Sequence, residues 1–269
     1  MPASRRLPPH HTGRAELIAC LHLLPLPGSP GWGGDMNAVL GRALDEAEIF
    51  AAAGVDGMIL ENTHDIPYLN RPREAATVAA MAVVAAEVRR RYPHALGIQV
   101  LAGANAAALD IALTCDLDFI RVEGFAYAHV ADEGLIEADA GPLMRRRAHL
   151  GATHIEVWAD IKKKHSAHAI TADLTLRDIA AGAHYYGAEG VIVTGGMTGQ
   201  PASLAELDSI ADLGPRRAVG SGVTAANLAD YAARADALIV GSDLKEGGDW
   251  RGAVVPARVR EMVRLLRAR

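Results

Sequence analysis

The stretch Tyr186-Gly187-Ala188-Glu189-Gly190-Val191-Ile192-Val193 ends a helical pattern at a glycine and enters a short run of β-branched residues. A second stretch, Ala51-Ala52-Ala53-Gly54-Val55-Asp56, repeats this transition. Glycine ends a helix readily because it adopts the left-handed backbone conformation that closes a helix C-terminus. Both stretches therefore predict a helix that leads directly into a buried strand, as in a parallel α/β sheet.

Eight apolar runs of this kind alternate with helical patterns. The runs are residues 17–21, 55–60, 96–101, 119–122, 154–158, 190–193, 217–219 and 237–240, and the clearest helical patterns are 37–53, 73–91, 174–186, 202–212 and 256–267. Eight such units in a chain of this length are typical of a closed barrel. The main alternative is an open doubly wound sheet, but its GxGxxG turn is missing after the first run. We therefore predict an α/β fold, a single (β/α)8 TIM barrel over residues 15–269, preceded by a flexible tail of residues 1–14.

The composition excludes several classes of protein. The net charge is −5, so the chain as a whole is not drawn to nucleic acid or to an anionic membrane. Its two arginine triplets, residues 89–91 and 145–147, fall at the ends of helical patterns, where cations face the negative end of the helix dipole. No apolar run approaches the roughly 20 residues that span a bilayer, and the tail lacks the apolar core of a secretory signal.

Only two cysteines are present, Cys20 and Cys115, and each lies in an apolar context. No disulfide framework is expected from them. We expect a reduced, cytoplasmic protein with a small phosphorylated ligand as partner, without nucleic acid and without integral membrane association. Both a monomer and a homo-oligomer are compatible with the sequence.

In a TIM barrel the chemistry concentrates just after each strand. Polar residues follow the first five predicted strands in succession: His22; Glu61, Asn62 and Asp65; Asn105; Glu123; and Asp160, Lys164 and His165. One polar residue at a strand end is commonly a solvated loop group or a helix cap, but five strands in succession locate a site. We assign His22, Asn62, Asp65 and Asn105 to substrate binding.

Glycine-rich loops follow the last three predicted strands. They hold Thr194, Gly195, Gly196, Thr198 and Gly199, then Gly220, Ser221 and Gly222, and finally Gly241 and Ser242. Glycines let backbone amides approach an anion, and loops after strands seven and eight are where such barrels bind phosphate. We predict that these residues bind phosphate. Asp243 conflicts with an anion there, unless Lys245 offsets its charge or Asp243 caps the next turn.

The stretch Asp160-Ile161-Lys162-Lys163-Lys164-His165 carries the most reactive side chains. Strand alternation sends its even-numbered residues to one side and its odd-numbered ones to the other, unless the alternation lapses where the strand ends. A lysine in a partly desolvated barrel mouth can serve as a base or a nucleophile, and three solvated lysines are the alternative. The acid–base candidates of the whole site are Glu61, Glu123, Asp160, Lys164 and His165.

A divalent metal is a further alternative. The oxygen and nitrogen ligands on offer are Glu61, Asp65, Glu123, Asp160, His22 and His165. No HxH or HExxH spacing is present, so a metal is not favoured and any cofactor is unknown.

The same loops resemble the BtpA family. The resemblance rests on residues 21–30 (Leu-His-Leu-Leu-Pro-Leu-Pro-Gly-Ser-Pro), Glu61-Asn62 with Asp65 and Pro67, Ala159-Asp160 with Lys164-His165, and residues 193–195 with Thr198-Gly199. It continues through residues 220–224 and 240–242, with Leu244-Lys245 and Gly248. The resemblance implies a barrel like those that bind ribulose phosphate. The family is named for photosystem I biogenesis, but other members lie beside sugar-metabolism genes, which implies an underlying enzyme.

The chain departs from the expected family pattern at two strand ends. After the third strand, Ala102 and Gly103 stand where an Arg and an Asn are expected, and after the fourth, Glu123 replaces an expected Asn. These departures predict a different substrate with phosphate binding retained.

Three functions follow from the sequence. The first is an enzyme that acts on a sugar phosphate or a nucleotide-like metabolite by acid–base chemistry, as a lyase, an isomerase or a glycosidic-bond-cleaving enzyme. The second is a non-catalytic assembly or regulatory factor, which requires a large exposed apolar patch. The third is a sugar-phosphate sensor. The polar strand ends favour the enzyme.

Overall fold

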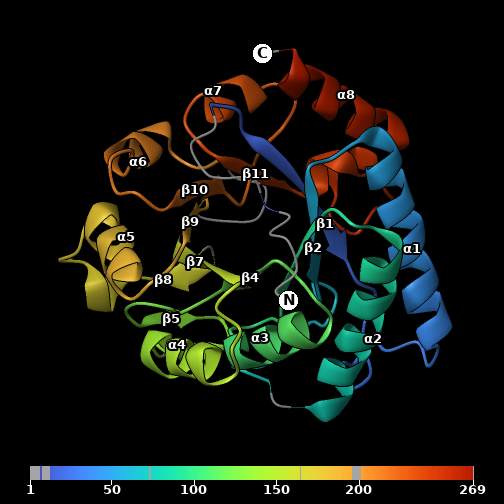
Figure 1. The fold of residues 1–269 in the computed structure, drawn as a ribbon, viewed down its shortest axis with the longest axis horizontal. Coiled ribbons are helices and arrows are strands. Elements are labelled where there is room, and N and C mark those ends of the chain that lie inside the picture. The colour runs from blue at the N-terminus through green and yellow to red at the C-terminus, as the bar shows by residue number, and fades with distance from the viewer. Residues whose placement is uncertain (1–6, 8–12, 73, 164, 196–200, 269) are drawn as a thin grey trace.

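Eight parallel strands close into a barrel, with helices around its outside (Figure 1). The computed structural model describes residues 7, 13–72, 74–163, 165–195 and 201–268. The barrel strands are β1 (Glu16–His22), β2 (Gly57–Glu61), β3 (Ala95–Gln99), β4 (Phe119–Val122), β7 (Glu156–Lys162), β9 (Gly190–Val193), β10 (Arg216–Val219) and β11 (Ala237–Val240). Each pairs with its neighbours in sequence order, and β11 returns to pair with β1. The predicted (β/α)8 TIM barrel is confirmed.

The helices follow the strands as the sequence predicts. They are α1 (Met36–Ala53), α2 (Ala75–Arg91), α3 (Asn105–Thr114), α4 (Ala140–His149), α5 (Leu176–Tyr185), α6 (Leu204–Ser209), α7 (Leu228–Ala232) and α8 (Pro256–Arg267), with 3-10 turns η1 (Ala169–Thr171), η2 (Ser242–Leu244) and η3 (Glu246–Gly248). Gly54, with φ +80°, ends α1 in the left-handed conformation, and Gly187, with φ +94°, follows α5. Within the described part of the chain, no helix combines the length and the apolar character needed to cross a membrane.

The strands are buried on both faces, which explains their continuous apolar sequences. Residues such as Leu17 and Leu21 of β1 face the surrounding helices, whereas Ile18 and Cys20 alternate with them and face the barrel interior. Leu7, from the segment expected to be a tail, is buried with this inner cluster.

The structure extends the fifth barrel strand beyond the range that the sequence predicts. The prediction ended it at Trp158, but β7 continues to Lys162, with a bulge between Asp160 and Lys162. The strand was cut short because its charged residues were interpreted as a loop. A bulge inserts one extra residue into a ladder and shifts the alternation beyond it.

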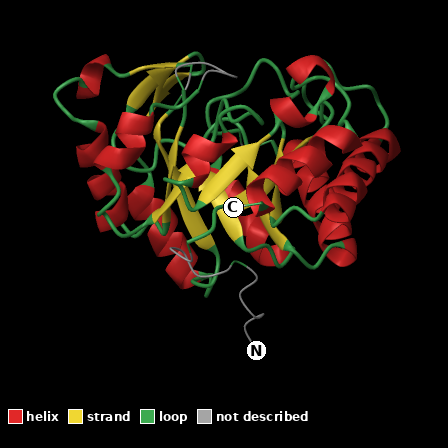
Figure 2. Ribbon diagram, turned by 90° about the horizontal axis from the view of Figure 1, so that it is seen from above, coloured by secondary structure: helices red, strands yellow, loops and turns green. Residues whose placement is uncertain are grey.

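A second sheet, which the sequence did not predict, is antiparallel and has the order β6-β5-β8. It consists of β5 (His129–Ala131), β6 (Gly134–Ile136) and β8 (Ser166–Ala167), which come from the connections after β4 and β7. The turn between β5 and β6 carries Glu133, which lines the cavity at the barrel mouth. In a view perpendicular to that of Figure 1, the barrel strands run toward the end of the barrel at which the connections after β4 and β7 lie (Figure 2).

Candidate functional site

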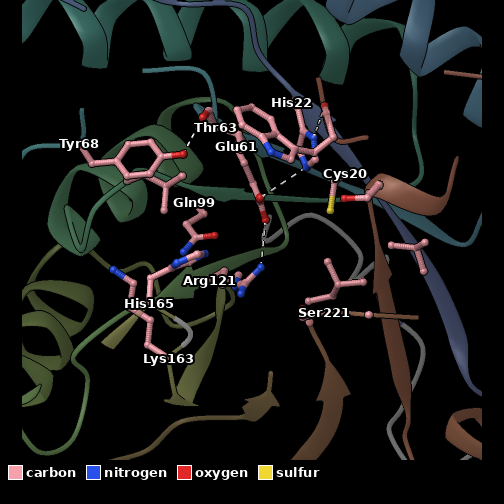
Figure 3. Close-up of a pocket in the computed structure, with 18 of the residues that line it drawn as sticks. Cys20, His22, Glu61, Thr63, Tyr68, Gln99, Arg121, Lys163, His165 and Ser221 are labelled. Atoms are coloured by element: carbon pink, nitrogen blue, oxygen red, sulfur yellow. Dashed lines mark hydrogen bonds and ion pairs between the residues drawn. The ribbon is translucent and has the colours of Figure 1, made fainter. Parts of the chain in front are cut away.

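A cavity of about 640 Å³ opens at the C-terminal ends of the barrel strands. Its lining combines carboxylates from β2, from the residue after β4 and from the β5–β6 turn with an arginine from β4, a lysine that follows β7, and the loops after β10 and β11. Figure 3 shows these side chains converging from separate strands. The predicted location of the site, at the strand C-termini, agrees with this cavity.

Arg121 is the central cation of the cavity. Its Nε and Nη2 donate to the two carboxylate oxygens of Asp160, each at 3.1 Å, and its Nη1 donates to Glu61 Oε1 at 3.2 Å. All three side chains are buried, and the pair with Asp160 has the two-pronged geometry that fixes an arginine firmly. The pKa of Arg121 stands above its usual value because the carboxylates of Asp160 and Glu61 outweigh the opposing effect of burial.

Glu123 forms a second charged cluster. Its Oε1 accepts from Gln99 Nε2 at 3.0 Å, and its Oε2 lies 3.2 Å from Lys163 Nζ, which also lies 3.1 Å from Glu133 Oε2. Burial raises the pKa of Glu123 to about 7, and the Lys163 ammonium offsets that rise only in part. Burial lowers the pKa of Lys163, but Glu123 and Glu133 outweigh it and hold that pKa above its usual value. Glu123 is therefore a carboxyl poised to exchange a proton near neutral pH, beside a lysine that stays charged.

The bulge in β7 decides which lysine faces the cavity. Asp160 points inward to Arg121, Lys162 is 49% exposed and pairs with Glu206 outside, and Lys163 is 9% exposed and turns inward. Regular alternation would have placed Lys162 on the same side as Asp160; the other alternative, a lapse of the alternation near the strand end, agrees with the structure, because the bulge inserts an extra residue. Lys164 lies outside the described residues, and His165 lines the cavity.

Cys20, His22 and Glu61 meet on the wall formed by β1 and β2 (Figure 3). His22 Nε2 lies 3.9 Å from Glu61 Oε2, and the ligand atoms of the three buried residues lie within 4.8 Å of one another. Among the described residues, this is the group of three or more side chains whose spacing suits a metal ion. The sequence places Cys20 in an apolar context, and the candidate metal ligands drawn from the sequence did not include it.

Three residues that were assigned to substrate binding make contacts within the protein instead of lining the cavity. Asn62 accepts from the Leu101 amide at 2.8 Å and donates to Asp65 at 2.9 Å, and Asp65 in turn accepts from the Leu26 amide at 2.7 Å. Asn105 donates to the Glu123 carbonyl at 2.7 Å. These residues fix the loops that carry the cavity lining, and His22 is the assigned residue that reaches the cavity itself.

The loops after β10 and β11 lie together on one wall of the cavity. Gly220, Ser221, Gly222, Gly241 and Ser242 line it. Four residues that line the cavity have backbone amides that donate no hydrogen bond to any other described residue. They are Gly222, Val223, Ser242 and Asp243. Such amides can receive an anion.

The loop after β9, the sixth strand of the barrel, contributes less to this wall. Thr194 donates to the Lys162 carbonyl at 2.7 Å, and neither it nor Gly195 lines the cavity. Gly196, Thr198 and Gly199 lie outside the described residues.

Asp243 does not oppose an anion in the way its sequence position suggested. Its carboxylate accepts from the Ala225 amide at 3.2 Å and from Arg258 at 3.3 Å. Lys245 lies elsewhere, fully buried, with Nζ 3.1 Å from the Trp250 carbonyl and 3.8 Å from Glu46. Neither alternative from the sequence describes Asp243: Lys245 does not offset its charge, and its carboxylate bonds to Ala225 of the preceding loop and to Arg258 instead of capping the turn that follows.

Sequence reasoning missed Arg121, Gln99 and Lys163. A signal existed for Arg121, since a charged residue within the four-residue apolar strand Phe119–Val122 requires a buried partner. Gln99, at the end of β3, gave a weaker signal of the same kind.

Comparison with known proteins gives one family and a set of relatives. The sequence profile described as the BtpA family matches residues 14–268. An uncharacterized mitochondrial protein of Caenorhabditis elegans is 40% identical over 260 residues, covering 94% of each chain. The photosystem I biogenesis protein BtpA of Synechocystis is 36% identical over 248 residues, covering 90% of this chain and 85% of that protein.

Among solved structures, phosphoribosyl anthranilate isomerase from Thermus thermophilus has a similar fold. The TM-score is 0.55 with 13% identity, and the match covers 94% of this chain and 98% of that chain. A likeness at this identity establishes the fold, the TIM barrel, and nothing finer.

Proposed function

The chain belongs to the BtpA family, and from that premise we propose that it is an enzyme that acts on a small phosphorylated sugar or nucleotide-like metabolite by acid–base chemistry. The observation that carries the proposal is Glu123, a buried carboxyl with a pKa of about 7, in the same cavity as a group of unpaired loop amides. A ligand held by its phosphate at those amides extends into the cavity toward that carboxyl.

The phosphate site is the wall formed by the loops after β10 and β11. The amides of Gly222 and Ser242 donate to the anion, and Gly222, with φ +69°, holds a turn that other residues adopt only with strain. The position agrees with the phosphate sites of other TIM barrels, between the last two βα loops. Thr194, Gly195, Gly196, Thr198 and Gly199, from the loop after β9, remain part of the proposed site.

Glu123 is the proposed proton-transfer group. A general acid or base works best when its pKa lies near the operating pH, because both protonation states are then available. Lys163 stays charged and stabilises negative charge that develops on the substrate. Glu61 and Asp160 form ion pairs with Arg121 and orient polar groups of the ligand, and His165 and Lys164 complete the proposed set of acid–base residues.

These roles suit reactions in which a proton moves to or from carbon or a leaving oxygen. Isomerisation, lyase cleavage and glycosidic-bond cleavage of a sugar phosphate all require that step. A sensor would share the phosphate site without turnover. The Synechocystis relative is named for photosystem I biogenesis, and a chain that acts only as an assembly factor needs no proton-exchanging carboxyl in the cavity at the barrel mouth.

The test begins with a thermal-shift screen of phosphorylated sugars and nucleotides, followed by turnover assays on the ligands found. Glu123→Gln should lower kcat by roughly 100- to 10,000-fold while the ligand Kd changes little. Gly222→Asp should abolish ligand and inorganic phosphate binding, because it puts a carboxylate against the anion. Binding without turnover by any ligand would leave a sensor, and an absence of binding throughout the screen would refute the phosphate site.

The proposed setting of this enzyme is the cytoplasm. Cys20 and Cys115 are both buried and neither forms a disulfide, which agrees with a reduced compartment. The proposed partner is the small phosphorylated ligand, and the chain works as a monomer or as a homo-oligomer.

A further inference from the structure

We propose that Cys20, His22 and Glu61 bind one divalent transition-metal ion of the zinc type on the wall of the cavity. Cys20 and His22 are two residues apart on β1, so both point into the barrel, and Glu61 lies opposite His22 in the β1–β2 ladder. The backbone of two adjacent barrel strands, β1 and β2, therefore positions all three ligands. Metal binding is measured without a substrate, so this inference does not depend on the proposed function.

The spacing of the ligand atoms is close to that of a tetrahedral site. Zinc bonds of about 2.0–2.3 Å put neighbouring ligand atoms roughly 3.5 Å apart. His22 Nε2 and Glu61 Oε2 are 3.9 Å apart, and Cys20 Sγ lies with them inside a 4.8 Å limit. Small side-chain rotations close the remaining gap.

The hydrogen bonds of His22 prepare its ring for a metal. Its Nδ1 lies 3.3 Å from the Trp250 carbonyl oxygen, which can only accept, so a neutral His22 that donates from Nδ1 presents Nε2 to a metal. Metal-binding histidines are commonly oriented in this way, by donating the other ring N–H to a backbone carbonyl. Nε2 is the nitrogen that faces Glu61.

Glu61 divides its two oxygens between two partners. Oε1 accepts from Arg121 Nη1, and Oε2 is the oxygen nearest His22. Arg121 is itself held by both oxygens of Asp160, so the carboxylate of Glu61 is fixed in orientation by a buried chain of contacts. Such outer contacts raise the precision of a metal site.

Gly241 leaves room beside these ligands. A Cβ at this position would lie 2.8 Å from His22 Nε2 and 3.3 Å from Cys20 Cβ. The three protein ligands leave a fourth position on the cavity side, as in a catalytic zinc site. The thiolate and imidazole ligands favour zinc, cobalt or copper over magnesium, and the thiol proton leaves to solvent when the metal binds.

The experiment uses the full-length protein without an affinity tag, stripped with a chelator and titrated with Co²⁺ and then Zn²⁺. We expect one Co²⁺ per chain, a thiolate-to-cobalt charge-transfer band, and loss of that band when Zn²⁺ displaces the cobalt. Cys20→Ser should remove the band. It should also weaken Co²⁺ binding by at least roughly 10- to 100-fold, which is the loss seen when a residue that only orients a metal ligand is removed. His22→Gln should weaken binding similarly.

Cys115→Ser is the matched control, because Cys115 is also a buried cysteine that forms no disulfide, at the end of α3 and outside the cavity lining. It should keep both the band and the affinity. Gly241→Ala tests the site without replacing a ligand, because its added methyl group crowds His22 Nε2, and weaker metal binding is expected from it. The proposal is overturned if folded protein binds no stoichiometric Co²⁺, or if Cys20→Ser binds it as tightly as the parent chain does, which would place the metal on other histidines.

Discussion

Phe119 and Trp158 stack inside the barrel, with their ring centroids 4.2 Å apart and their planes inclined by 20°. Each ring lies against a glycine of a neighbouring strand. A Cβ at Gly97 would lie 2.3 Å from the Phe119 ring, and one at Gly190 would lie 2.8 Å from the Trp158 ring. These glycines make room for the aromatic layer beneath the cavity.

We expect Gly97→Ala to destabilise the fold by about 1–3 kcal/mol, because the methyl group overpacks the interior. Urea unfolding followed by circular dichroism measures the change. Gly33→Ala is the control, since a Cβ there meets nothing within 4 Å and should leave the midpoint almost unchanged. Equal effects of the two substitutions would disprove this account of the barrel interior.

Arg121→Met should destabilise the protein by about 3–5 kcal/mol, because it leaves Glu61 and Asp160 buried without their cation. Arg146→Met removes an arginine that pairs with Asp110 at the surface, and such pairs contribute about 0–1 kcal/mol. Chemical denaturation of the two variants compares a buried pair with an exposed one. A loss below 1 kcal/mol for Arg121→Met would contradict the charge network described above.

The raised pKa of Glu123 predicts a pH dependence of stability. Between about pH 4.5 and pH 7 the folded state retains a proton that the unfolded chain has released, so proton binding stabilises the folded state there. This stabilisation is complete below pH 4.5 and is lost as the pH rises through 7. In Glu123→Gln, the decline in the free energy of unfolding from pH 5 to pH 8 should become shallower.

Part of the decline should survive in that variant. Burial also raises the pKa of Glu16, at the other end of the barrel, to about 7, and it raises the pKa values of Glu46 and Asp139, so the slope should become shallower instead of vanishing. Urea unfolding at a series of pH values measures both slopes. An unchanged slope in Glu123→Gln would show that Glu123 is ionised throughout this range.

Lys163→Met should raise the pKa of Glu123 above its value of about 7, because the ammonium group that favours the carboxylate is removed. The decline in the free energy of unfolding should then continue to higher pH, because it ends where the carboxyl of the folded protein ionises. Lys162→Met is the matched control, since Lys162 pairs with Glu206 on the outside and should leave the profile in place. A shift in the control of the same size would assign the effect to net charge alone.

The barrel could be predicted from the sequence because its strands are buried on both faces. That environment requires continuous apolar runs, and runs such as residues 119–122, 190–193 and 237–240 coincide with β4, β9 and β11. The small sheet of β5, β6 and β8 could not be predicted in this way. Its strands are two or three residues long and partly exposed, with Val130 and Leu135 at the surface, so they leave no periodic pattern.

The location of the candidate site was predictable, but the partners within it were not. Strand order alone places Glu61, Glu123 and Asp160 at one end of the barrel. Which carboxylate pairs with Arg121 and which with Lys163 depends on strand register and on the bulge, and both are set by tertiary contacts. For that reason the sequence could not separate the proton-exchanging Glu123 from Glu61 and Asp160, which are neutralised by Arg121.

The bulge in β7 also bears on how this site tolerates insertions and deletions. In a regular ladder the inward residue after Asp160 would be Lys162; with the bulge it is Lys163. Because the chain carries consecutive lysines here, a cation reaches the barrel mouth in either register. Either register of the strand therefore places a lysine at the cavity. A shift of one residue in this strand would exchange one lysine for another and would keep a positive charge at this position.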